Sequence, residues 1–309
     1  MNEIDLTNYF EKRYRFEEIN NVSIDGKNYI FKFLPRDNLF KYDLENFYND
    51  LIVSELCEKV GIESCKVYLG KYKNRYGTLV ENYKTNDKAI YVNGSIILKD
   101  YLKHLEKNHL VNEYLGENIC YPISNEYKNY LINKMNNLET IWDALNYHYR
   151  NFSDSKRCEI VKKIMDELTK RYSLDYLVMQ TDRHERNWEI EETVNDAFLT
   201  PLYDNELSFC FDSYVPELKV DINNKIKFDS ELEKYLSFSS DYYKEEFVNL
   251  YNILTPEFIE NTIKQLEIRM NFSFPVIYKQ TVIKNYSKHY NDIASILNKT
   301  KNKRWFYAR

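Results

Sequence analysis

Hydrophobic and polar residues alternate in several short runs near the start of the chain, and this pattern predicts a small β-sheet. The segments Phe16–Ile24 and Lys27–Leu34 flank Asp25-Gly26, a dipeptide typical of two-residue hairpin turns. The segments Lys66–Gly70 and Gly77–Asn82 have the same strand character. We therefore expect a β-hairpin followed by two further strands.

A helix is expected between these two pairs of strands, over residues 46–60. Tyr48, Ile52, Leu56 and Val60 recur at four-residue steps, which places them on one face of a helix. Gly61 follows directly and is a residue type that commonly ends helices. Residues 1–83 are thus interpreted as a small lobe made of a sheet and one helix.

Helical periodicity dominates the remainder of the chain. Hydrophobic residues between positions 161 and 172 follow helical spacing and lead directly into the segment YSLDYLVMQTDRHERNWEI. Later, Thr255-Pro256-Glu257 combines a capping residue, a first-turn proline and an early acid, which is typical of a helix start. The sequence therefore predicts an α+β protein in which residues 84–309 form a larger, mainly helical lobe.

Composition restricts the class of protein. The chain of 309 residues is 43% hydrophobic and 29% charged, which is typical of a soluble globular protein. A net charge of −5 with scattered cations argues against direct binding of nucleic acid. Five cysteines without a C-x-x-C pair favour reduced thiols over disulfides or a zinc site. Without a signal-peptide core or a long apolar run, the chain is expected to be cytoplasmic and not to bind membranes.

Three polar residues form the candidate chemical centre. Asp182 and Asn187 lie in DRHERN, and Asp204 follows seventeen residues after Asn187. The segments Trp188–Ile190 and Phe198–Tyr203 have strand character, and a hairpin between them would place Asn187 and Asp204 on neighbouring strands. Amide and carboxylate oxygens suit Mg²⁺, which completes its coordination with phosphate oxygens and water. We therefore predict a magnesium site formed by Asn187 and Asp204.

Asp182 precedes Asn187 by five residues, which is the spacing of the D-x-x-x-x-N catalytic loop of protein kinases. In that loop the Asp orients the attacking hydroxyl and the Asn binds metal. Polar loops of this composition also occur without a catalytic role. The hydrophobic helix before the loop, the strand directly after it and the second Asp-containing strand nearby together favour phosphoryl transfer.

Lys32 interrupts the otherwise hydrophobic strand segment YIFKFL. A buried ammonium group needs an anionic partner, so Lys32 either reaches solvent at a sheet edge or binds an anion such as ATP phosphate. We favour the phosphate. In kinases this lysine also pairs with an acid on the following helix, where Asp50 and Glu55 are both candidates.

These residues resemble the HipA-like kinases, in particular the compact, stand-alone members of that family, and more distantly the phosphatidylinositol kinases. The resemblance spans nearly the whole chain. It rests on DGKNYIFKF, NDLIVSELCEKVGI, VYLG and LVENYKTNDKAIYVNGSIIL, and most specifically on QTDRHERNW with PLYDNELSF. It implies a two-lobed, protein-kinase-like fold with an N-lobe of residues 1–83 and a C-lobe of residues 84–309.

The resemblance also implies a role for each matching residue. Asp182 would be the catalytic aspartate, and Asn187 and Asp204 would hold Mg²⁺. Lys32 would contact the ATP phosphates. The helix glutamate of the family falls on Asp50, which is one methylene shorter and therefore weakens the expected pair with the lysine.

Further positions follow from the same resemblance. Val80, Glu81 and Asn82 would belong to the hinge beside the adenine and contact it through backbone groups. His184 would position the catalytic loop, with an ordinary hydrogen-bonded histidine as an equal alternative. No glycine-rich phosphate loop is visible, because Gly26 lies in the hairpin turn and the next glycine is Gly61.

The expected function is that of a serine/threonine protein kinase that uses ATP and Mg²⁺ and acts on a protein substrate. One alternative is a nucleotide-binding pseudokinase that works as an interaction module, which the missing glycine loop favours. Another is a lipid or small-molecule kinase, which the acidic charge and the lack of a membrane-binding helix oppose. The extra N-terminal module of the larger HipA toxins is not part of this sequence, so an antitoxin-type partner is not inferred.

Overall fold

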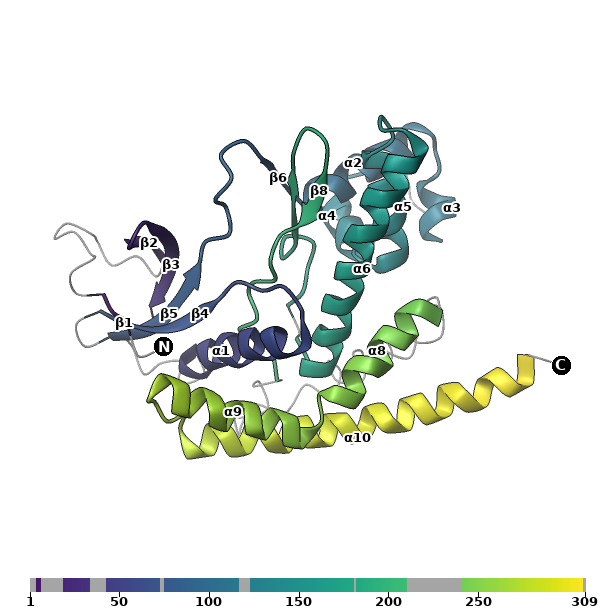
Figure 1. Cartoon of the computed structure of the whole chain (residues 1–309). Helices are drawn as coiled ribbons and strands as arrows, with labels where there is room; N and C mark the ends of the chain where they lie inside the picture. The colour runs from purple at the N-terminus through teal and green to yellow at the C-terminus, as the bar shows by residue number, and fades with distance from the viewer. Residues whose placement is uncertain are drawn as a thin grey trace. The chain divides into compact units, whose positions relative to one another are not determined.

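The computed structural model describes residues 4–6, 19–33, 43–72, 75–116, 123–180, 182–209 and 241–307. Its elements are, in chain order, β1 (Ile4–Asp5), β2 (Ile19–Ile24), β3 (Lys27–Phe33), α1 (Asp43–Val60), β4 (Val67–Tyr72), β5 (Arg75–Glu81), β6 (Ile90–Asn93), α2 (Gly94–Lys107), α3 (Val111–Leu115), α4 (Asn125–Lys134), α5 (Leu138–His148), α6 (Asp154–Val178), β7 (Glu189–Glu192), β8 (Ala197–Leu199), α8 (Asp241–Ile253), α9 (Pro256–Met270) and α10 (Val276–Tyr307) (Figure 1).

The chain divides into two compact units. The first comprises Met1–Tyr83, Tyr172–Asp182 and Tyr203–Arg309, and the second comprises Lys84–Arg171 and Arg183–Leu202. The start of the first predicted strand and the residue Leu34, as well as Cys120 and Cys210, lie outside the described residues.

The first unit contains a five-stranded sheet in the order β1-β4-β5-β3-β2. Strands β2 and β3 form the predicted hairpin, with Ile24 paired to Lys27 across the turn. Both turn residues have positive φ, 50° at Asp25 and 78° at Gly26, which matches the right-handed twist of the flanking strands. The hairpin predicted from this dipeptide is therefore confirmed.

A hydrophobic cluster on this sheet fixes the position of β3. Leu6, Val22, Phe31, Tyr72 and Leu79 are all buried and pack together. Phe31 and Leu79 face each other across β3 and β5. Because side chains alternate along a strand, burying Phe31 in the cluster turns the neighbouring Lys32 to the opposite face of the sheet.

Helix α1 packs against β4 and β5, and α9 packs against both α1 and α10 (Figure 1). Gly61 follows α1 with a φ of 72°, and the N–H of Ile62 donates to the carbonyl of Cys57, as expected for a left-handed helix end. The predicted cap of α9 is confirmed, since the hydroxyl of Thr255 accepts from the N–H of Phe258 at 3.2 Å.

The second unit combines a three-stranded sheet, in the order β6-β7-β8, with helices α2 to α5 and most of α6. Strand β6 is not among the elements expected from the sequence. It has only four residues and pairs antiparallel to β7, from Ile90↔Glu192 to Asn93↔Glu189. The side chain of Asn93 then accepts from the N–H of Ser95 at 2.8 Å and caps α2.

The hairpin after the candidate catalytic loop forms as predicted, but it is shorter than expected. Strands β7 and β8 pair from Ile190↔Leu199 to Glu192↔Ala197. The prediction that Asn187 and Asp204 lie on neighbouring strands is wrong, because β7 begins after Asn187 and β8 ends at Leu199. Pro201 explains this end, since a proline has no N–H to donate to a ladder.

The far end of β7 is held by hydrogen bonds from α5 and the residue after it. The carboxylate of Glu192 accepts from Nε2 of His148 and from the hydroxyl of Tyr149, each at 2.8 Å. Burial alone would raise the pKa of Glu192, but these two donors outweigh burial and bring the pKa below its usual value. The ionised form of Glu192 is therefore favoured by folding.

Replacing Glu192 by Gln is expected to lower the free energy of unfolding at pH 7 by about 1 kcal/mol, because the charged acceptor is lost. A depressed pKa stabilises the fold above the unfolded pKa and loses this effect as pH falls through the folded pKa. The gap between wild type and variant should therefore close below about pH 4 in urea titrations, given an ordinary glutamate pKa near 4.3. The control is Glu191→Gln, a change at the neighbouring glutamate, whose carboxylate accepts from the Asn86 amide in the wild type. If wild type and Glu192→Gln differ as much in their free energy of unfolding at pH 3 as at pH 7, folding does not favour the ionised form of Glu192.

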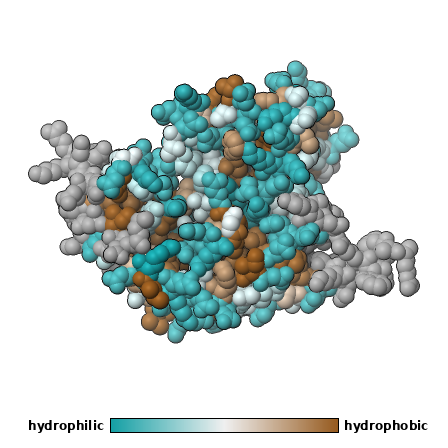
Figure 2. Space-filling view, viewed as in Figure 1, coloured by the Kyte–Doolittle hydropathy of each residue, from teal (hydrophilic) through white to brown (hydrophobic). Residues whose placement is uncertain are grey.

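Hydrophilic residues cover most of the molecular face shown in Figure 2, with hydrophobic ones dispersed among them. Within the described parts of the chain, none of the helices combines the length and hydrophobicity needed to span a membrane.

Candidate active site

Lys32 is surrounded by three carboxylates of the first unit. Its Nζ lies 2.7 Å from Oε1 of Glu206, 3.5 Å from Oδ1 of Asp204 and 4.0 Å from Oδ2 of Asp50. The short contact to Glu206 is a charge-assisted hydrogen bond, whereas the distance to Asp50 is too long for one. Glu55, the other candidate from the helix, pairs instead with Arg269 and Lys59.

The charges of this cluster perturb one another. Burial tends to lower the pKa of Lys32, but the neighbouring carboxylates, Asp50 foremost, outweigh it and hold the pKa above the usual value. Burial raises the pKa of Asp50 above its usual value, against the opposing effect of Lys32. The lysine is therefore firmly protonated, which its predicted role as a phosphate ligand requires.

Two side chains of helix α1 hold the segment after Asp204 by hydrogen bonds to the backbone of that segment. Oδ1 of Asp50 accepts from the N–H of Asn205 at 2.6 Å. The amide of Asn49 donates to the carbonyls of Glu206 at 2.7 Å and of Ser208 at 2.9 Å. Both α1 side chains are buried, so these bonds are protected from water and fix the course of residues 205–208.

Gln180 links the backbone at Asp182 to the backbone at Asp204. Its Oε1 accepts from the N–H of Asp182 at 3.1 Å, and its Nε2 donates to the carbonyl of Asp204 at 3.0 Å. Gln180 is itself buried. Asp204 has a φ of 62°, a left-handed conformation that is uncommon outside glycine and is often found at functional sites. The two aspartates predicted to act in catalysis are therefore connected by one buried side chain.

In the second unit, His184 and Asn187 form a tight turn. The N–H of His184 donates to Oδ1 of Asn187 at 3.1 Å, and the N–H of Asn187 donates to the carbonyl of His184 at 3.0 Å. Nδ1 of His184 accepts from the N–H of Arg186 at 3.1 Å. His184 thus stabilises the loop that carries Asn187.

Trp188 anchors this loop to the rest of the second unit. Its Nε1 donates to Oδ1 of Asn136 at 3.1 Å, and its carbonyl accepts from the N–H of Gly94 at 3.0 Å. The amide of Asn136 also reaches the carbonyl of Arg183 at 3.4 Å. The indole is 2% exposed, so Asn187 is attached directly to a residue fixed in the core.

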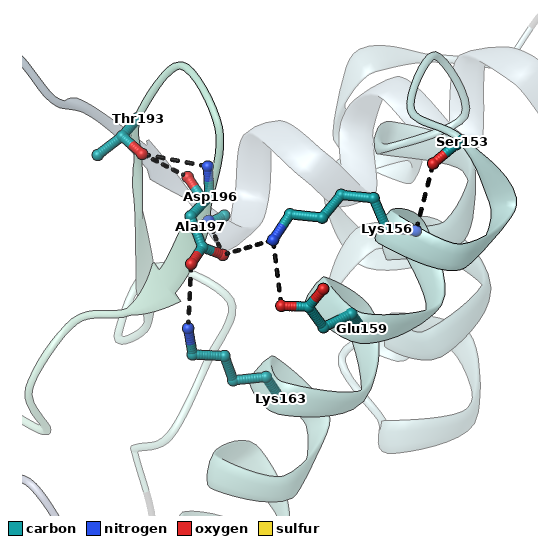
Figure 3. A network of polar contacts seen from close by, with 7 residues as sticks. All are labelled: Ser153, Lys156, Glu159, Lys163, Thr193, Asp196 and Ala197. Carbon is teal, nitrogen blue, oxygen red and sulfur yellow. Dashed lines mark hydrogen bonds and ion pairs between the residues drawn. The ribbon is translucent and has the colours of Figure 1, made fainter.

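The turn between β7 and β8 is fastened to α6 through Asp196 (Figure 3). Its carboxylate lies 3.7 Å from Nζ of Lys156 and 3.4 Å from Nζ of Lys163. The N–H of Ala197 donates to the same carboxylate at 2.9 Å. Burial by itself would raise the pKa of Asp196, but this N–H and the two lysines together outweigh it and lower the pKa below its usual value. The hairpin is therefore supported at its turn as well as at its base.

The predicted hinge residues lie at the end of β5 and directly after it. The N–H of Glu81 donates to the carbonyl of Lys66, and the N–H of Asn82 donates to the carbonyl of Asn28, each at 2.9 Å. These two N–H groups are therefore engaged in backbone hydrogen bonds at the end of β5. The role of Val80, Glu81 and Asn82 beside an adenine stays a prediction.

The structure thus brings Lys32, Asp50 and Asp204 together in the first unit, with Asp182 attached through Gln180. Asn187 and His184 meet in the second unit, and joint metal binding by Asn187 and Asp204 stays a prediction. Sequence reasoning missed Glu206, Gln180 and Asn49. PLYDNELSF contains Glu206, but its pairing with a lysine 174 positions earlier has no local signal.

These features belong to a kinase-like α+β fold. The proinflammatory kinase CtkA of Helicobacter pylori is similar over 98% of this chain and 99% of its own, with a TM-score of 0.60 and 14% sequence identity. A chain of the HipA–HipB–operator DNA complex of Shewanella oneidensis MR-1 is similar over 89% of this chain and 59% of its own, with a TM-score of 0.47 and 11% identity.

No protein-family model matches the chain, and no curated protein is significantly similar to it in sequence. At 14% identity the similarity to CtkA establishes a common fold. The kinase-like fold implied by the family resemblance of the sequence is therefore confirmed.

Proposed function

We propose that this chain is an ATP- and Mg²⁺-dependent phosphotransferase, and specifically a serine/threonine protein kinase of the HipA-like type. The observation that carries the proposal is the cluster of Lys32, Asp50 and Asp204 in a kinase-like fold, with Asp182 tied to Asp204 through Gln180. Lys32, Asp50, Asp182 and Asp204 were all candidates from the sequence, and none of them was chosen for its proximity to the others.

Each residue has a distinct task in this proposal. Lys32 binds a phosphate of ATP and holds it by charge. Asp182, whose side chain is exposed, accepts a hydrogen bond from the acceptor hydroxyl and takes its proton as the phosphoryl group departs from ADP. Gln180 positions Asp182 relative to Asp204. Phosphoryl transfer needs little more from a protein than such positioning and charge stabilisation.

Asp204 and Asn187 are the proposed magnesium ligands. Within the described residues, no group of three or more His, Cys, Asp or Glu side chains could hold a metal ion by itself. A kinase-type Mg²⁺ needs only a few protein oxygens, because phosphate oxygens and water complete its coordination. The carboxylate of Asp204 and the amide oxygen of Asn187 fit that donor set. The ion would neutralise phosphate charge as transfer proceeds.

The proposal is tested by offering the purified chain radiolabelled ATP and Mg²⁺ together with protein, lipid and small-molecule acceptors. Transfer to a serine or threonine of a protein is the expected result. Transfer only to a lipid or metabolite would replace the protein-kinase assignment. A thermal-shift titration with ATP and Mg²⁺ accompanies the assay, and the absence of both binding and transfer would refute phosphotransfer altogether.

A pseudokinase is the second candidate, and one observation favours it. The β2–β3 connection is a two-residue turn, Asp25-Gly26, rather than a longer loop that could cover phosphates. In that case ATP and Mg²⁺ would raise the melting temperature while no acceptor is labelled. Detectable transfer that depends on Asp182 would eliminate this candidate.

A further inference from the structure

The contacts of Lys32 are unevenly distributed between the interior and the solvent. The side chains of Glu206 and Asp204 are 33% and 41% exposed, whereas that of Asp50 is 2% exposed. Lys32 itself is 27% exposed. A phosphate would approach from solvent, which is also where Glu206 is accessible. Glu206 makes the shortest contact with the ammonium group, at 2.7 Å.

The buried side of the same lysine is incompletely paired. Oδ2 of Asp50 is buried and has no hydrogen-bond partner among the described residues, although it lies 4.0 Å from Nζ of Lys32. A buried carboxylate oxygen without a donor is costly. A shift of about 1 Å by the ammonium would supply that donor, since N–H···O bonds span about 2.9 Å.

We propose that Glu206 is a binding-site residue that competes with the nucleotide phosphates for Lys32, and that Asp50 retains the lysine once Glu206 has been displaced. This inference rests on the function proposed above. The ammonium has three donors, and its shortest hydrogen bond in the structure goes to Glu206. A phosphate beside that carboxylate would meet like-charge repulsion as well as a lysine already engaged.

Replacement of Glu206 by a phosphate at Lys32 requires movement of the Glu206 side chain only. The backbone carbonyls of Glu206 and Ser208 are held by Asn49, whose own Oδ1 accepts from the hydroxyl of Tyr278 at 2.9 Å. This buried support fixes the peptide while leaving the partly exposed Glu206 carboxylate free to rotate away. The cost of breaking the Lys32–Glu206 ion pair thus lowers the affinity for the nucleotide.

The test compares the binding of adenosine, ADP and ATP, each with Mg²⁺, to the 309-residue wild-type chain and to its E206Q variant by calorimetry. E206Q should bind ATP about tenfold more tightly, which corresponds to loss of one competing charge-assisted hydrogen bond. Adenosine should bind equally to both proteins, because it carries no phosphate. D50N, which keeps an acceptor for the N–H of Asn205, should instead weaken ATP binding about tenfold.

A Lys32→Met background provides the matched control. Adding E206Q to it should raise ATP affinity much less than tenfold, because the lysine for which the two anions compete is gone and only the like-charge repulsion is relieved. If E206Q binds ATP no better than wild type does, or binds it more weakly, competition is refuted and Glu206 instead supports binding. If neither wild type nor E206Q binds ATP, the proposed function fails, and this inference fails with it.

Discussion

Replacing Asp182 by Ala is expected to lower the rate of phosphoryl transfer by a factor of about 10² to 10⁴, the usual contribution of a positioned general base. The acceptor hydroxyl would lose both its hydrogen-bond acceptor and the group that takes its proton. Initial rates of transfer from radiolabelled ATP, measured at saturating acceptor, report the loss directly.

The fold should tolerate this change. The side chain of Asp182 is exposed, and the bond that ties this residue to Gln180 uses its backbone N–H, which alanine retains. The free energy of unfolding should therefore stay within about 0.5 kcal/mol of wild type. ATP affinity should also be preserved, because Lys32 and Asp204 remain.

Asp87→Ala removes an exposed aspartate elsewhere and is the matched control, with full activity expected. Two results would contradict the role of Asp182. One is a D182A variant that transfers phosphate as fast as wild type. The other is a rate loss that only accompanies a loss of ATP binding, since that would make Asp182 a ligand-binding residue.

Replacing Gly94 by Ala is expected to cost about 3 kcal/mol of folding free energy, at the upper end of the usual range for overpacking. A Cβ at this position would lie 2.2, 2.4 and 2.6 Å from three ring atoms of Trp188. The indole is buried and its Nε1 donates a hydrogen bond to Asn136, so the ring cannot move aside without loss of folding free energy. Urea unfolding followed by circular dichroism measures the loss.

Phosphoryl transfer should fall in the same variant, because displacement of Trp188 moves the adjacent Asn187.

A double-mutant cycle separates the steric clash between a Cβ at position 94 and the Trp188 ring from other effects of the substitution. In a Trp188→Leu background the smaller side chain relieves the contact, and the cost of Gly94→Ala should drop below about 1 kcal/mol. An equal cost in both backgrounds would show that the glycine is required by the backbone rather than by the ring.

Elements that depend on neighbouring residues could be predicted from the sequence. The Asp25-Gly26 turn, the Gly61 helix end and the Thr255 cap each form within a few positions of the residues that specify them. Strand β6 could not be predicted in this way. It is four residues long and exists because it pairs with β7, about a hundred positions further along the chain.

The extent of β8 shows how two local signals can conflict. Hydrophobic residues continue to Tyr203, and that pattern predicts a strand up to that point. Pro201 cannot donate to the ladder, and the strand ends at Leu199. Asp204 consequently lies in a segment that Gln180 and α1 hold, outside the hairpin.

For the site, the sequence by itself determined which chemical groups are available and in what order. The loop containing Asp182 and Asn187, the later Asp204 and the lysine within a hydrophobic strand were all recognisable from residue type and spacing. Only the tertiary structure decided that Glu206 holds Lys32 and that Asp50 lies buried behind it. The physical reason is that ion pairing depends on distance and burial, and both are set by segments that meet only after folding.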